Sequence, residues 1–130
     1  MGPLVDTSVL VDAFRGVASP EVATFRRHSL DGPPPATVPV ILQEVLQGAR
    51  NEDDLRRLVK HLSFFEPLGA PSYAIHEQAA EIFRRVRRAG LTSATVDVLI
   101  VAIAAAHRRR LLSSDAIQRR IATLAGVELA

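Results

Sequence analysis

The residues whose types could do chemistry are carboxylates far apart in the chain: Asp6, Glu44, Asp97 and Asp115. Asp97 is the least comfortable of them, because it is the only charged residue between Ala89 and Ala106, in a stretch that is otherwise largely apolar. Burying an ionised carboxylate there costs several kcal/mol unless a helix N-terminus, a basic partner or a metal ion compensates its charge. A helix capped by Thr95 would place Asp97 in its first turn, where the dipole favours negative charge. That explains one tolerated aspartate and leaves the other three carboxylates unexplained.

Carboxylates gathered at one point repel one another, so some must protonate unless a cation lies among them. Oxygen ligands without histidine or cysteine suit a hard divalent ion, Mg²⁺ or Mn²⁺, which keeps several of its waters. Such an ion activates a water for attack on phosphorus and stabilises charge on the phosphate oxygens, and a second ion can support the leaving oxygen. If the fold brings these side chains together, the expected reaction is hydrolysis of a phosphodiester bond.

Each carboxylate also has an ordinary structural explanation. Asp6 can be a turn residue, and Asp115 can lie in a first helical turn behind a cap at Ser113 or Ser114. Glu44 lies well away from the apolar stripe of its helix, so it can equally be a surface residue. The elements around these residues decide between the two readings.

The predicted strands cover residues 4–6, 36–38, 62–65, 111–113 and 127–129, and predicted helices separate them. The helices begin after the first strand and then near Ser19, Pro39, Asn51, Ser72, Thr95 and Ser114. This alternation indicates a parallel sheet with helices on both faces, an α/β three-layer sandwich formed by a single domain over residues 1–130. Ligands of such sheets bind beyond the carboxyl ends of the strands, where Asp6 and Asp115 lie.

Composition excludes several other classes of protein. The chain has 130 residues, 48% hydrophobic and 23% charged, which is typical of a globular domain. It has no cysteine, and its four histidines have no zinc-binding spacing. The apolar run after Asp97 is far shorter than the roughly 20 residues that cross a bilayer. No signal peptide precedes the first strand, so we expect a cytoplasmic protein without a membrane anchor.

Four blocks of the sequence resemble the signature blocks of PIN-domain ribonucleases. In chain order they are VDTSVLVD, VPVILQEVLQGA, TVDVLIVAIAAAH and LLSSD. No single block is specific, but the four follow the family's order and span nearly the whole chain. The short length and the spacing most resemble the VapC toxins of toxin–antitoxin pairs.

The resemblance implies a PIN-like fold and Mg²⁺-dependent endoribonuclease activity, with Mn²⁺ as a substitute ion. It makes Asp6 and Asp97 the principal Mg²⁺ ligands, with Glu44 and Asp115 completing the acidic site. All four acidic positions are filled, which favours an active enzyme.

The resemblance also implies supporting residues and partners. Ser8 and Ser113 become hydrogen-bond partners of the acidic site. Ile117 stands where the family commonly has an aromatic residue. The implied partners are an RNA substrate, a second copy of the chain in a homodimer, and a VapB-type antitoxin whose C-terminal segment occupies the active-site groove.

The basic residues are almost all arginine, with a formal net charge of +2 and Lys60 as the only lysine. They form three clusters: Arg84, Arg85, Arg87 and Arg88; Arg108 to Arg110; Arg119 and Arg120. These clusters could line a groove for RNA phosphates or could simply be a solvated surface. One tyrosine and no tryptophan argue against an aromatic platform for stacked bases.

Other readings of the same residues were weighed. A phosphoacceptor receiver domain needs a lysine near its aspartate, and Lys60 lies in the wrong half of the chain. A haloacid-dehalogenase-type phosphatase needs a second aspartate where Ser8 stands. The main alternative is a catalytically silent PIN-like module that binds RNA or protein, and a nuclease acting on DNA also remains open.

Overall fold

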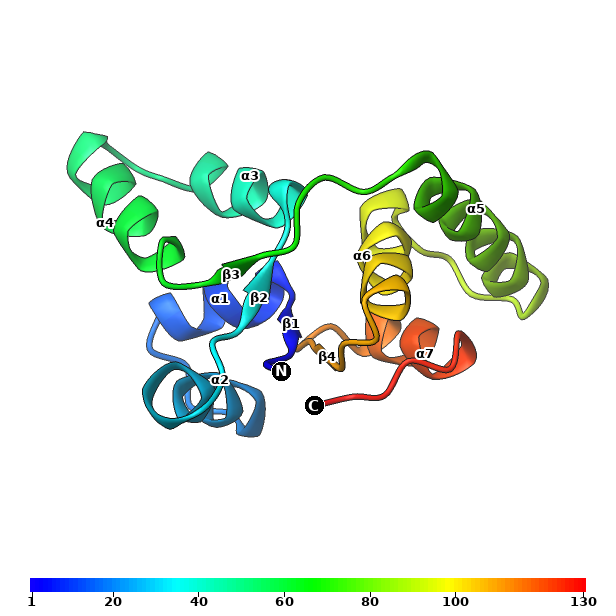
Figure 1. Cartoon of the computed structure of the whole chain (residues 1–130), viewed down its shortest axis with the longest axis horizontal. Helices are drawn as coiled ribbons and strands as arrows, with labels where there is room; N and C mark the ends of the chain where they lie inside the picture. Colours follow the sequence, from blue (N-terminus) through cyan, green and yellow to red (C-terminus); the bar gives the residue numbers. More distant parts are fainter.

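The computed structural model describes all 130 residues and is an α/β fold built on a four-stranded parallel sheet (Figure 1). Its elements in chain order are β1 (Leu4–Val5), α1 (Thr7–Phe14), α2 (Pro20–Asp31), β2 (Ala36–Thr37), α3 (Pro39–Gln47), α4 (Glu52–Leu62), β3 (Glu66–Pro67), α5 (Tyr73–Arg88), α6 (Thr95–Ala106), β4 (Leu111–Leu112) and α7 (Ala116–Leu124). The predicted α/β class and its parallel sheet are confirmed.

The sheet has the strand order β3-β2-β1-β4, and each strand is two residues long. Leu4 pairs with Ala36 on one side, and Val5 pairs with Leu112 on the other. Since the strands are parallel and in this register, the chain leaves β1 and β4 at the same edge, through Asp6 and Ser113. Because each strand is only two residues long, the hydrogen-bonded ladder ends close to this edge of the sheet.

Helices cover both sides of the sheet. On one side α1 contacts α2 and α3, and α3 contacts α4, whereas α5, α6 and α7 contact one another on the other side (Figure 1). A cluster of 28 buried apolar residues fills the interior. Helix α6 is deepest in it, with Val98 and every residue from Ile100 to Ala104 buried. The expectation that this helix is buried is therefore confirmed.

Three predicted helix caps are present. The side chain of Ser19 accepts a hydrogen bond from the amide of Val22, and that of Asn51 accepts one from Asp54 at 2.8 Å. Ser72 opens α5 in the same way, through the amide of Ile75. These caps fix where three of the helices begin, as their sequence signals predict.

The predicted strand at 62–65 is wrong. Helix α4 continues to Leu62, because Leu58 and Leu62 share one buried face, and the strand begins only at Glu66. This edge strand contains Pro67, which cannot donate to a ladder on its outer side. The glutamate and proline of β3 do not form a strand-like pattern in the sequence, whereas the apolar residues at 62–65 do.

Three smaller expectations also need correction. Ala94, without a side-chain hydrogen bond, precedes α6, so Thr95 is its first residue and not its cap. The strand predicted at 127–129 is reduced to a single bridge between Leu111 and Leu129. Leu42, whose place beside Ile41 in the apolar pattern of α3 predicts burial, is 39% exposed.

None of the helices combines the length and the continuous apolar surface that a bilayer crossing requires.

Candidate metal-dependent nuclease site

Asp6 is the buried member of the acidic group, with 5% of its surface exposed. It leaves β1 in an extended conformation and caps α1, where its Oδ2 accepts a hydrogen bond of 3.0 Å from the amide of Ser8. Its Oδ1 accepts a second hydrogen bond, of 3.1 Å, from the side-chain amide of Gln118. Both oxygens therefore have a fixed direction, which is what a preorganised ligand requires.

Glu44 lies half-buried in the second turn of α3 and is not a free surface residue. The hydroxyl of Thr7, the first residue of α1, donates a hydrogen bond of 2.8 Å to its Oε1. Since Thr7 directly follows Asp6, this bond holds Glu44 beside the end of β1. Thr7 was not expected to have this role, and only its position beside Asp6 could have indicated it.

Asp97 is half-buried in the first turn of α6. Burial and the negative charges of Asp6, Asp115 and Glu44 together raise the pKa of Asp97 to about 6. The helix N-terminus favours the charged form, but it does not outweigh burial and the three neighbouring charges. The charges of the other three predicted carboxylates act on Asp97, which indicates that all four side chains lie near one another at the carboxyl edge of the sheet.

Asp115 does not lie behind a serine cap, as one expectation had it, but is itself the N-cap of α7. Its Oδ1 accepts a hydrogen bond of 2.9 Å from the amide of Gln118. Ser113 Oγ accepts from the amide of Asp115, and Ser8 Oγ accepts from the amide of Ser114. Ser8 thus ties the segment after β1 to the segment after β4, whereas Ser113 bonds within the segment after β4.

Gln118 was not singled out from the sequence, yet its polar groups are near three of the acidic residues. It is fully buried, its side-chain amide donates to Asp6, and a longer contact of 3.4 Å reaches the carbonyl oxygen of Asp97. Its side-chain oxygen Oε1 has no hydrogen-bond partner. The Asp115-x-x-Gln118 spacing, typical of a helix-capping box, could have marked this residue.

The donors at this edge fit a hydrated divalent cation. A cation would reduce the repulsion that, together with burial, raises the pKa of Asp97. No group of three histidine, aspartate or glutamate side chains is arranged to hold a metal ion by itself. Mg²⁺ usually binds through one or two carboxylates and keeps several waters, so this arrangement suits it.

The arginine clusters have different environments. Arg109 is buried, where it donates to the carbonyl of Gly2 and pairs with Glu66, so its expected place in an RNA groove is wrong. The arginines of α5 are exposed. Two of them, Arg84 and Arg87, line a cavity of about 580 Å³ that also includes residues on either side of Asp97, namely Thr95 and Val98.

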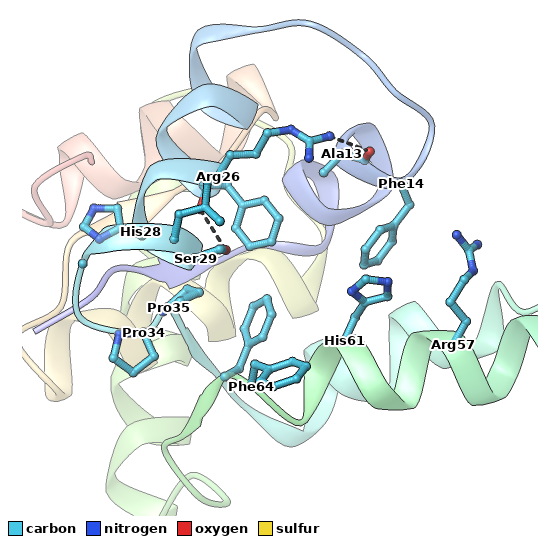
Figure 2. A pocket seen from close by; sticks show the side chains of 14 residues that line it. Ala13, Phe14, Arg26, His28, Ser29, Pro34, Pro35, Arg57, His61 and Phe64 are labelled. Atoms are coloured by element: carbon cyan, nitrogen blue, oxygen red, sulfur yellow. Dashed lines mark hydrogen bonds between the residues drawn. The ribbon is translucent and has the colours of Figure 1, made fainter.

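A second cavity, of about 480 Å³, lies between α1, α2 and α4 (Figure 2). Phe14 and His61 lie side by side there, with ring centroids 5.6 Å apart, and Phe25 packs near Phe65. Phe64 is at its edge and is 71% exposed. None of the four carboxylates lines this apolar cavity.

The sequence matches known proteins over most of its length. The family model described as "PIN domain" matches residues 4–124. Ribonuclease VapC11 of Mycobacterium tuberculosis and a VapC ribonuclease of Mycobacterium bovis are each 32% identical over 115 residues. Each alignment covers 87% of this chain and 86% of the relative.

Solved structures share the fold of this chain. VapBC2 from Rickettsia felis, solved bound to a DNA fragment from its promoter, has a TM-score of 0.80 at 19% identity and covers 100% of this chain and 98% of that chain. A toxin–antitoxin complex from Klebsiella pneumoniae has a TM-score of 0.65 at 26% identity, over 85% of this chain and 83% of that chain. The protein therefore belongs to the PIN-domain family and, within it, to the VapC-type ribonucleases.

Proposed function

We propose that this protein is a Mg²⁺-dependent endoribonuclease that hydrolyses RNA phosphodiester bonds as the toxin of a toxin–antitoxin pair. One observation carries the proposal: Asp97 is half-buried, and Asp6, Asp115 and Glu44 lie near enough for their charges to add to the effect of burial, which together raise its pKa to about 6. A structural role would not require four carboxylates from four segments to share one edge of the sheet, because their repulsion costs stability.

When bound, Mg²⁺ supplies an activated water and positive charge for the phosphate oxygens. Asp6 and Asp97 would be its principal ligands, with Glu44 and Asp115 completing the acidic site. Asp6 is suited to this role by its two fixed hydrogen bonds. Ser8 keeps the segments that carry Asp6 and Asp115 together, and Ser113 supports the backbone of Asp115.

RNA would reach the acidic cluster over the exposed arginines of α5. Arg84 and Arg87 share a cavity with Thr95 and Val98 of α6, the helix that carries Asp97, although Asp97 itself does not line that cavity. Guanidinium groups bind phosphate through paired hydrogen bonds and carry no base specificity by themselves. Contacts of this kind support a phosphodiester substrate.

The VapB-type antitoxin would bind at two places. Its C-terminal segment would occupy the acidic groove, as the family resemblance implies, and apolar side chains would enter the cavity between α1, α2 and α4. Leu30 and Phe64 support the second contact, because they are 81% and 71% exposed around an apolar hollow. The toxin–antitoxin complex from Klebsiella pneumoniae is one of the similar solved structures.

A homodimer in the cytoplasm is the expected setting, and light scattering of the purified protein tests its oligomeric state.

The deciding experiment compares the wild type with the double variant Asp6→Asn/Asp97→Asn. Binding of Mn²⁺ and Mg²⁺ is measured by calorimetry, and cleavage of a structured RNA and of a DNA of the same sequence is followed in parallel. Circular dichroism of both proteins shows whether the variant is folded.

Metal binding and RNA cleavage that are both lost in a folded variant would support the proposal. Cleavage of DNA in preference to RNA would mean that the proposed hydrolysis is right and that the proposed RNA substrate is wrong. Unaltered metal binding in the variant, with no cleavage by either protein, would overturn the proposal and leave a catalytically silent binding module.

A further inference from the structure

Gln118 has a role that its position in α7 does not explain. An aspartate at the N-cap followed by glutamine three residues later is the pattern of a capping box. In that motif the glutamine side chain accepts a hydrogen bond from the N-cap amide. Here the amide of Asp115 donates instead to Ser113 Oγ, at 3.1 Å. The Gln118 side chain therefore does not make the hydrogen bond that the capping box would require of it.

The side chain of Gln118 instead contacts residues far away in the sequence. Its Nε2 donates to Asp6 Oδ1 at 3.1 Å, across 112 positions of the chain, and lies 3.4 Å from the carbonyl oxygen of Asp97. Its backbone amide meanwhile binds the carboxylate of Asp115. One residue thus connects the segments that carry three of the four carboxylates.

This arrangement is unfavourable for stability alone. Gln118 is fully buried, and its Oε1 has no hydrogen-bond partner. A buried polar atom without a partner is unfavourable for stability. An apolar side chain of similar size would fill the same space without that cost, so packing does not account for a glutamine at this position.

We propose that Gln118 is a positioning residue of the metal site, which orients Asp6 by donating to its Oδ1. The inference rests on the proposed function, because it concerns the same acidic cluster. Residues that hold a metal ligand in place typically change metal affinity by about 10–100-fold when they are replaced. Gln118 does not need to touch the ion or the substrate for this effect.

The test uses Gln118→Met, which keeps most of the side-chain volume and removes both the donor and the unpaired oxygen. The exposed Gln78→Met on α5 is the matched control. For the full-length proteins, the melting temperature is measured without metal, the Kd for Mn²⁺ is measured by calorimetry, and RNA cleavage is measured at saturating Mn²⁺.

We expect Gln118→Met to melt at or above the wild-type temperature and to bind Mn²⁺ at least 10-fold more weakly, in line with other ligand-orienting residues. Gln78→Met should change neither quantity. A purely structural glutamine would give the reverse pattern, a lower melting temperature with an unchanged Kd, and that result would overturn the inference. If the methionine variant does not fold, Gln118→Leu undergoes the same measurements with the same expectation.

The two proposals can fail separately. Wild-type protein that binds no Mn²⁺ and cuts no RNA removes the nuclease and, with it, the role of Gln118. Wild-type protein that binds and cuts, beside a Gln118→Met variant of equal affinity, removes only the role of Gln118.

Discussion

The hydroxyl of Thr7 donates a hydrogen bond of 2.8 Å to Oε1 of Glu44, across 37 positions of the chain. It joins the first residue of α1 to the second turn of α3, and so brings the least obvious of the four carboxylates to the end of β1. Helix periodicity alone placed Glu44 off the apolar stripe, which is correct, because the side chain faces a polar site and not the core.

Thr7→Val should leave the fold intact and weaken the site. Valine has nearly the same shape, so the loss is the hydrogen bond, worth about 1 kcal/mol. We expect RNA cleavage to fall several-fold because Glu44 is no longer held, with a melting temperature that changes by a few degrees at most. The matched control is Thr24→Val, whose exposed hydroxyl bonds only to its own helix. Equal cleavage by the two variants would remove the role of Thr7.

Asp97→Asn should abolish cleavage and raise the melting temperature of the metal-free protein. The charge that is removed is the one most disfavoured by burial and by its acidic neighbours. Asp31→Asn, on the exposed end of α2, is the control and should alter neither quantity. An Asp97→Asn protein that unfolds, or that cuts RNA at the wild-type rate, would contradict this role for Asp97.

The raised pKa of Asp97 also predicts how stability depends on pH. The pKa of Asp97 is about 6 in the folded protein, against 3.8 for the unperturbed carboxyl. Between these values the folded state binds more protons than the unfolded state, so the free energy of unfolding falls as pH rises. Each pKa unit corresponds to about 1.4 kcal/mol, which we halve because Asp97 is only half-buried. Metal-free protein should therefore melt several degrees higher at pH 5 than at pH 7.5, and Asp97→Asn should lose most of this difference.

Metal binding should show the opposite pH dependence. A cation competes with the proton on Asp97, so affinity for Mn²⁺ should rise as pH increases through about 6. Calorimetric titrations at pH 5.5 and 7.5 measure the change. The same affinity at both values would mean that Asp97 is not a ligand.

Arg84→Gln/Arg87→Gln should raise the KM for RNA with little change in kcat. These side chains would bind phosphates of the RNA away from the acidic residues and take no part in the chemistry, because none of the four carboxylates lines their cavity. Each lost phosphate contact should also reduce the salt dependence of RNA binding by about one unit of slope. The exposed Arg27→Gln/Arg56→Gln pair, which lines none of the cavities described above, is the control. A lower kcat with an unchanged KM would contradict this assignment.

Phe64→Ser should weaken the complex with the antitoxin and leave RNA cleavage by the free toxin unchanged. Phe64 is 71% exposed at the edge of the apolar cavity, so its loss removes binding area without disturbing the core. Tyr73→Ser, an exposed aromatic outside that cavity, is the control. The dissociation constant of the complex and the rate of RNA cleavage are the two measurements, and equal affinity in both variants would exclude the cavity as a contact.

The sequence predicted those parts of the molecule whose signals are local. Ser19, Asn51 and Ser72 begin helices because a side-chain oxygen before a helix serves its first amides. The parallel sheet followed from the alternation of elements. The strand at Glu66 did not, because a half-exposed edge strand with a proline has neither the alternation nor the apolar run of a buried one.

The acidic residues were predicted by type and order, and Ser8 and Ser113 were expected beside them, but the contacts made by Thr7 and Gln118 were not. Asp6 and Asp115 follow strands, which places them at one edge by topology alone. The Thr7–Glu44 and Gln118–Asp6 hydrogen bonds depend on how three helices pack, and no local pattern encodes such contacts. The buried Arg109 shows the same limit, since its charge alone suggested a surface position.

The pairing of β1 with β4 bears on when the protein becomes active during its own synthesis. Asp6 receives its hydrogen bond from a residue made 112 positions later, so the acidic edge is incomplete while the intervening chain is still emerging from the ribosome. At about 5–20 residues per second, that interval is roughly 6–20 s. If the chain is the ribonuclease proposed above, it would lack a complete acidic site until its last helix folds against its first strand.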